Sequence, residues 1–178
     1  MRTGKVNGYF GNALIKILLP KKFQTLAKGL RLAGYGGQVD ELILSMNRAA
    51  EKAAPKAKRV FVETITSMTF DDARQILDGG DTAATDFFKQ RTSSSLYDQF
   101  RPVIDRTLNQ VGTMQKYNGM MDKVRQVPFV KGESLDVGDY VTDKALSGLF
   151  LILEQEEKRI RENPAARVTD LLKEVFGS

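Results

Sequence analysis

The hydrophobic and polar positions of the chain centre on one stretch near its end. Tyr140–Leu153 reads YVTDKALSGLFLIL, and its last nine residues, from Ala145, carry no charge. The charged run EQEEKRIRE follows directly. Such a pattern predicts a long helix whose apolar part is buried, and Gly148 within it indicates a close crossing with another helix. We therefore predict that Tyr140–Leu153 is a central helix around which the other elements pack.

Helical spacing of apolar residues also occurs through most of the earlier sequence. A basic amphipathic helix is predicted to begin at Pro20, and Pro55 separates two further helices over Val39–Ala53 and Val60–Met68. Ile15–Leu19 is short, hydrophobic and rich in β-branched residues, and a proline follows it. These features favour a short extended segment or a β-hairpin near Ile15–Leu19.

Signals for helix ends are clearest in the segment TFDDARQILDGGDTAAT. Thr69 suits an N-cap, and Asp71 and Asp72 follow it in the first turn, where the helix dipole favours acidic residues. Gly79-Gly80 suits the end of this helix, and Asp81 suits the N-cap of the next one. The segment therefore predicts two helices that meet at a tight corner.

Three more caps are predicted farther along the chain. Ser93–Ser95 suits the start of a helix that runs to Val111. Thr113 suits the start of a helix over Met114–Val127, and Asp139 suits the start of the central helix. With a short closing helix at the end of the chain, these elements predict an all-α helical bundle of about eight helices.

Composition changes this picture mainly by what it excludes. The chain has 178 residues, which suits a single helical domain over residues 1–178. It contains no Cys and no His, so it can build neither disulfides nor a Ser-His, Cys-His or thiolate zinc site. No stretch approaches the ~20 apolar residues of a membrane-spanning helix. We therefore expect a soluble protein without a metal, a cofactor or catalytic residues.

Charge is distributed unevenly along the chain. Residues 1–60 hold 12 Lys and Arg against 3 Asp and Glu, whereas the remaining residues hold 15 against 19. The split fits either an anionic partner, such as a lipid surface or nucleic acid, or two parts of one domain that neutralise each other. We favour the second interpretation because adjoining charges in a compact domain usually face each other or water. Nucleic acid is the least expected partner because Lys89 and Arg91 stand late in their predicted helix, far from where base contacts are usually made.

Four aspartates and one arginine are the polar candidates for a site. Paired carboxylates could hold magnesium or serve a hydrolase, provided that two or more converge. Because helix starts explain most of them, we favour caps over a carboxylate-dependent enzyme. The arginine stands in the first turn of the last predicted helix, where the dipole disfavours a cation, so we expect a carboxylate partner or, alternatively, a bound anion. The candidate residues are Asp71, Asp72, Asp78, Asp81 and Arg167.

A second candidate site is an apolar pocket. Methionine fills irregular apolar space, and a methionine-rich stretch precedes the central helix. Core packing is the simpler explanation, but the basic helix after Pro20 could also lie on an anionic membrane. Together these features keep an apolar-ligand or lipid carrier as an alternative function. The candidate pocket residues are Met114, Met120, Met121 and Phe150.

Several stretches resemble a bacterial family catalogued as domain of unknown function four-one-nine-seven. They are IKILLP (Ile15–Pro20), VDELILSMNRAAEKAAPKA (Val39–Ala57), MTFDDARQILDGGDTAATDFF (Met68–Phe88) and YVTDKALSGLFLILEQEEKRIRENPAARVTDLLKEVFG (Tyr140–Gly177). The resemblance implies a mainly helical, exported and often lipid-anchored protein with no assigned activity. It also implies a periplasmic or outer-membrane-associated location, with a lipid or an envelope protein as partner.

The start of the chain departs from the family pattern. The family's signal region and a preceding helix are missing, so we expect residues 1–11 to be a flexible or truncated N-terminus. The resemblance supplies no catalytic residues. We therefore expect a non-enzymatic binding or structural protein of the bacterial cell envelope, with the lipid carrier and the carboxylate-dependent enzyme as alternatives.

Overall fold

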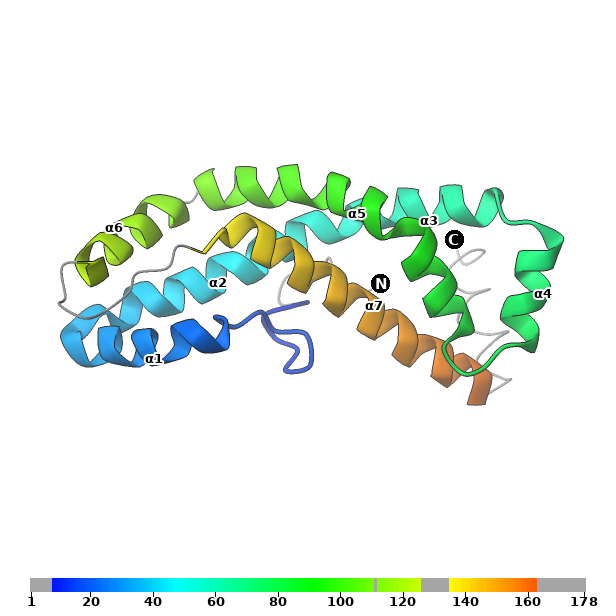
Figure 1. The fold of residues 1–178 in the computed structure, drawn as a ribbon, viewed down its shortest axis with the longest axis horizontal. Coiled ribbons are helices and arrows are strands. Elements are labelled where there is room, and N and C mark those ends of the chain that lie inside the picture. The colour runs from blue at the N-terminus through cyan, green and yellow to red at the C-terminus, as the bar shows by residue number, and fades with distance from the viewer. Residues whose placement is uncertain (1–7, 111, 126–134, 163–178) are drawn as a thin grey trace, which may run out of the picture.

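The computed structural model describes residues 8–110, 112–125 and 135–162, which form helices joined by turns. None of these residues lies in a strand, so the predicted all-α class is confirmed. Figure 1 labels the α-helices α1 to α7; a π-helical turn, η2, and a 3-10 turn, η3, join some of them. The bounds are α1 Lys21–Leu30, η2 Arg31–Tyr35, α2 Gly36–Ala53, η3 Ala54–Lys56, α3 Ala57–Thr66, α4 Phe70–Asp78, α5 Ala83–Gln110, α6 Thr113–Arg125 and α7 Val137–Glu162.

The number of separate helices is smaller than the sequence predicts. Since α1, η2, α2, η3 and α3 follow one another without a gap, the described residues form five continuous helical segments, not about eight. At Gly34 and Pro55, where the sequence predicts breaks between helices, the helical segment bends and continues. Gly34 has a φ of +87° inside η2, and Pro55 lies in η3. The predicted cap at Ser93–Ser95 is wrong, because α5 runs through it and the Ser93 hydroxyl donates to the carbonyl of Lys89 one turn earlier.

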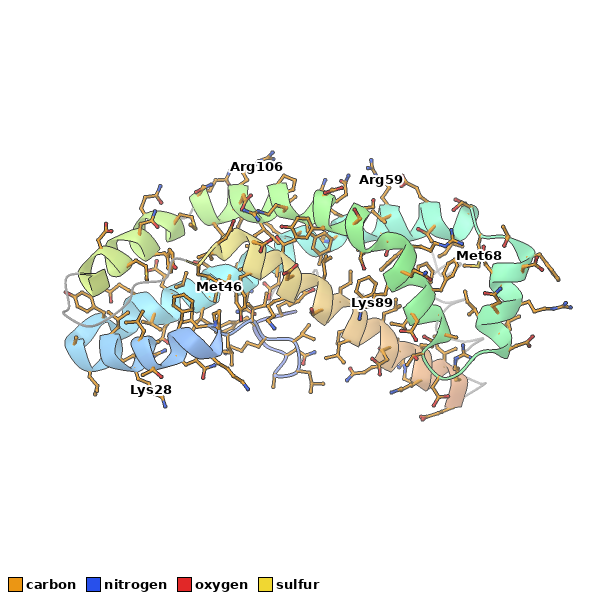
Figure 2. The ribbon with its side chains drawn as sticks, in the orientation of Figure 1. Lys28, Met46, Arg59, Met68, Lys89 and Arg106 are labelled. Atoms are coloured by element: carbon orange, nitrogen blue, oxygen red, sulfur yellow. The ribbon has the colours of Figure 1, made fainter. Side chains whose placement is uncertain are left out.

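The predicted central helix lies within α7. Its residues Val141, Ala145 and Leu149 are fully buried, and α7 packs against both α5 and α2 (Figure 1). Met46 of α2 lies in the same core (Figure 2). The second half of α7, beyond Leu153, carries the charged residues and is mostly exposed or half-buried.

The start of α7 differs from the predicted start. The Asp136 carboxylate accepts the amide of Asp139 at 2.9 Å, so Asp136 is the N-cap and the helix begins at Val137. The prediction of Asp139 as the cap is therefore wrong. Asp139 lies in the first turn, where its carboxylate accepts the hydroxyl of Tyr97 from α5. Two aspartates three residues apart offer two local starts, and contacts with α5 favour the earlier one.

The segment from Gly8 to Pro20 is irregular and lies between α2 and α7. The Asn47 side chain on α2 accepts the Ile17 amide and donates to the Ile17 carbonyl, both at 2.8 Å. A single amide side chain thus replaces the neighbouring strand that a β-hairpin would need. The β-hairpin predicted near Ile15–Leu19 is absent from the described residues for this reason.

Tyr9 fixes the beginning of the same segment. Its ring is fully buried, and its hydroxyl donates to the carbonyl of Ala145 in α7 at 2.6 Å. On the opposite side, Glu51 of α2 accepts the amides of Tyr9 and Phe10 at 3.0 and 3.1 Å. Burial and the charge of Glu51 raise the pKa of Tyr9, which keeps its hydroxyl protonated as a donor. Tyr9 therefore ties α2 to α7.

Candidate functional site

The four candidate aspartates are spread over both ends of α4 and do not share one centre. Asp71 and Asp72 lie in its first turn, Asp78 is its last residue, and Asp81 lies in the turn before α5. Asp72 and Asp78 are separated by about 9 Å along the helix axis. Among the described residues, no group of three acidic side chains could hold a metal ion.

Asp72 has a structural role at the start of α4. The Thr69 hydroxyl accepts the Asp72 amide at 3.1 Å, and the Asp72 carboxylate accepts the Thr69 amide at 3.0 Å. This reciprocal pair is a capping box, which confirms the N-cap predicted at Thr69. Hydrogen bonds from Thr69 lower the pKa of Asp72, with a smaller contribution from the charge of Arg91.

The start of α5 is capped by a residue that local sequence signals miss. Glu157 of α7 accepts the amides of Ala84 and Thr85, each at 2.8 Å, and the Thr85 hydroxyl at 2.7 Å. The predicted cap at Asp81 is therefore wrong, since a carboxylate from a distant helix occupies that position. The i,i+4 spacing of Glu157 and Arg161 indicates an ion pair in the sequence, but it gives no sign of the partner helix.

Arg161 extends this contact to α4. It donates to Glu157 at 2.9 Å and to the carbonyl of Ile76, near the end of α4, at 2.8 Å. Burial alone would raise the pKa of Glu157, but hydrogen bonds from Thr85, Ala84 and Arg161 outweigh it and lower that pKa. The pair thus joins the end of α4 and the start of α5 to α7.

The remaining candidates do not form one pocket among the described residues. Arg167 lies outside the described residues, as does the side chain of Met120. Met114 packs half-buried against the core, while Met121 lines a cavity of about 20 Å³ between α1, α2 and α6, room for about one water molecule. Phe150 does not line that cavity and packs on Phe61, with ring centres 6.4 Å apart.

A larger hollow, which we call the groove, lies between the irregular segment and α7. Its volume is about 560 Å³, and its lining runs from Leu14 to Lys21 and includes Gln24 at the start of α1. The lining residues of α7 stand at positions i, i+4, i+7, i+8 and i+11, which is one face of a helix. They are Tyr140, Lys144, Ser147, Gly148 and Leu151.

Two contacts hold the irregular segment along α7. At one end the Tyr140 hydroxyl donates to the carbonyl of Leu18 at 2.6 Å. At the other, a Cβ placed on Gly148 would lie 2.9 Å from Cε1 of Tyr9 and 3.1 Å from Cβ of Ile15. The prediction that another helix crosses at Gly148 is wrong, because the close approach is made by this irregular segment. The segment therefore runs antiparallel to α7.

The groove combines an apolar floor with basic side chains. Ile15 and Ile17 are buried in it, whereas Leu14 and Leu18 are 64% and 49% exposed at its edge. Lys16, Lys21 and Lys144 also line it, and no acidic residue of the described part of the chain does. The sequence indicates these residues only by a short hydrophobic segment and a basic helix, so the groove itself is not predicted.

Among the described residues, few ion pairs link the basic first third of the chain to the rest. Between described residues, Arg31 pairs with Asp40, and Arg48 pairs with Glu51 at 2.6 Å. The one such pair that crosses residue 60 is Arg59 with Glu63, at i,i+4 spacing within α3. The favoured interpretation, that the two parts of the chain neutralise each other, is therefore not supported by the pairs that join described residues.

Comparison with known proteins identifies a family but no activity. A family model described as a protein of unknown function (DUF4197) matches residues 1–177. No curated protein and no solved structure matches the chain. Within the described part, no helix has the length and apolar character needed to cross a membrane.

Proposed function

The chain belongs to the DUF4197 family of proteins of unknown function, and we propose that it acts by binding the apolar chain of a lipid in the groove. The proposal includes a location in the bacterial cell envelope, in the periplasm or at the outer membrane, where lipids are abundant. The proposed location is based on the resemblance of the sequence to this family. Binding, not catalysis, is proposed because the aspartates of α4 do not converge.

The observation that carries the proposal is the size and lining of the groove. Small-molecule sites usually measure ≈ 300–1,000 Å³ and are mostly apolar with a few polar groups, and the groove has about 560 Å³. From Tyr140 to Leu151 it follows α7 for about 16 Å. An elongated groove that is open to solvent fits an extended acyl chain better than a compact ligand.

The edge of the groove supports the same ligand. Leu14 and Leu18 stand more than 40% exposed on one side, although both belong to a segment whose neighbours are buried. Sites for apolar ligands are lined mainly by apolar side chains, and both leucines line the groove. An acyl chain in the groove would cover both leucines and recover the free energy of burying them.

Extraction and blocking of the groove test the proposal. Protein purified without detergent is extracted with organic solvent, and the extract is analysed by mass spectrometry for lipid. A dansyl-labelled fatty acid is then titrated into the protein below its micelle concentration. Ser147→Trp places a large side chain in the groove and should weaken probe binding by about tenfold or more.

Gln155→Trp is the matched control, because Gln155 is exposed on the same helix and does not line the groove. Its probe affinity should remain that of the unsubstituted protein. Repeated absence of lipid together with no probe binding would rule out the proposal. Equal weakening by both substitutions would also contradict it, since the probe would then bind elsewhere on α7.

A further inference from the structure

We infer that the groove is polarised and takes a single-chain anionic lipid, with its head group between Lys21 and Lys144 and its tail toward Leu14 and Leu151. This inference rests on the proposed lipid binding and adds the charge, chain number and orientation of the ligand. It follows from where the charged and apolar residues lie along the length of the groove.

The charged side chains that line the groove are basic. Of the residues that the structure describes, three lysines and no acidic residue line the groove. Lys16 differs from the other two because its charge acts on the carboxylate of Asp40 within the chain; its Nζ also lies 4.0 Å above the Phe10 ring. Neither Lys21 nor Lys144 forms an ion pair with another described residue. Two lysine charges are therefore available to an anionic head group.

Lys21 and Lys144 lie at the end of the groove where α7 begins. The Tyr140 hydroxyl binds the Leu18 carbonyl, so this end of α7 lies beside the last residues before α1. Lys144 follows Tyr140 by one turn, and its Nζ lies 5.8 Å from the centre of the Tyr140 ring. Lys21 begins α1 just after Leu18 and Pro20. The two lysines therefore lie at the same end, on opposite walls.

The start of α1 adds to the positive potential at this end. α1 has no acidic residue in its first turn and no side-chain cap at Pro20. The helix dipole carries partial positive charge at such a start, which favours an anion nearby. Gln24, in the first turn, also lines the groove and donates to the carbonyl of Leu19 at 3.2 Å.

The opposite end of the groove, beside Gly148 and Leu151, is mainly apolar. There Ile15 packs on Gly148, and Leu14 and Leu151 also line the groove, while the Nζ of Lys16, the residue after Ile15, lies over the Phe10 ring. Of the lining residues of α7, the two beyond Ser147 carry no polar side chain. A groove of about 560 Å³ that is basic at one end and apolar at the other suits one acyl chain in one direction. A phosphate or a carboxylate serves equally as the head group, because both offer anionic oxygens to lysine.

Amphiphiles that share one chain length test the charge. Dodecyl phosphate, laurate and dodecyltrimethylammonium are titrated separately into the full-length protein by calorimetry, below their micelle concentrations. The two anionic probes should bind about tenfold or more tightly than the cationic one, and this preference should shrink with added salt. A preference for phosphate over laurate, or the reverse, identifies the head group within the same inference.

Lysine substitutions locate the charge effect. The double variant Lys21→Gln with Lys144→Gln should lose most of the preference for anionic probes. The control, Lys28→Gln with Lys52→Gln, removes the same charge from exposed lysines that do not line the groove, and Lys28 projects away from the body of the molecule (Figure 2). The control should keep the preference. If both double variants lost the preference for anionic probes equally, the proposed position of the head group would be overturned.

A nitroxide on the lipid tests the orientation. With the nitroxide at the tail end, paramagnetic broadening of amide signals should be strongest at Ile15, Gly148 and Leu151. With the nitroxide beside the head group, the strongest broadening should instead be at Lys21 and Lys144. Reversed or equal broadening would overturn the orientation.

Equal affinity for all three amphiphiles would overturn the inference while leaving lipid binding in place, and no binding of any of them would remove the proposed function itself.

Discussion

Single polar side chains position the irregular segment that forms one wall of the groove. Asn47 is fully buried and satisfies both the amide and the carbonyl of Ile17, and the nearly buried Glu51 satisfies two further amides. Buried backbone groups that lack a partner cost about 1–3 kcal/mol each, so these contacts make an irregular buried segment tolerable. Neither residue stands out in the sequence, because each lies inside a regular amphipathic helix and its partner is more than 25 residues away.

Gly148 is the residue at which stability and groove shape depend on the same contact. Gly148→Ala should lower the free energy of unfolding by about 1–3 kcal/mol, because the new Cβ would lie 2.9 Å from Cε1 of Tyr9 and 3.1 Å from Cβ of Ile15. Urea unfolding followed by circular dichroism measures the change. Gly29→Ala is the control, since nothing lies within 4 Å of its added Cβ, and it should stabilise α1 by about 0.5–1 kcal/mol. No loss at Gly148 would mean that Tyr9 and Ile15 do not pack on α7.

At the scale of elements, local signals predict well where local interactions decide. Thr69 and Gly79 delimit α4 as predicted, because a capping box and a helix-ending glycine act within one turn. The signals fail where a distant helix decides. Ser93–Ser95 lies within α5 because the surrounding residues Leu96 and Phe100 are buried against other helices. Packing of that kind overrides the weak preference of serine for helix starts.

α4 is the element whose stability is most local, since none of its residues is buried. Thr69→Ala should remove the capping box and destabilise α4 by about 1 kcal/mol, which speeds hydrogen exchange of its amides about fivefold. Exchange measured by NMR should show the change in α4, while α5 and α7 keep their rates. Asp78→Asn, at the other end of α4, serves as the control and should leave exchange nearly unchanged. Uniform acceleration throughout the molecule would mean instead that α4 unfolds only with the whole protein.

At the scale of the molecule, the sequence predicts the class and the axis of the fold but not the site. The uncharged stretch from Ala145 to Leu153 indicates α7, because burial of a long apolar run dominates the energetics. The groove depends on how Leu14–Leu19 lies against α7, which follows from contacts across more than 120 residues, such as Tyr140 with Leu18. The apolar helix that motivates the lipid alternative supplies one wall of the groove, and the basic helix supplies only Lys21 and Gln24 of its first turn. The predicted methionine pocket does not contribute to the groove.

One ion pair connects three helices of the molecule, and it makes global stability depend on pH. Glu157 is 8% exposed and accepts hydrogen bonds from the start of α5, while Arg161 joins it to the end of α4. The pKa of Glu157 is lowered in the folded state from its ordinary value of 4.5, so ionised Glu157 stabilises the fold above that value. This contribution should be lost as the pH falls through the folded-state pKa.

Glu157→Gln removes this charge and should lower the free energy of unfolding at pH 7 by about 1.5–3 kcal/mol, since hydrogen bonds to a charged acceptor are lost. Below the folded-state pKa the unsubstituted protein is protonated at the same position, so the difference between the two proteins should shrink. Urea unfolding of both proteins between pH 7 and pH 3 measures it. Glu156→Gln is the control, because Glu156 pairs with Arg159 while half exposed and should cost less than about 0.5 kcal/mol at any pH. A difference for Glu157→Gln that stayed constant down to pH 3 would mean that the shape of the side chain, and not its charge, holds α4, α5 and α7 together.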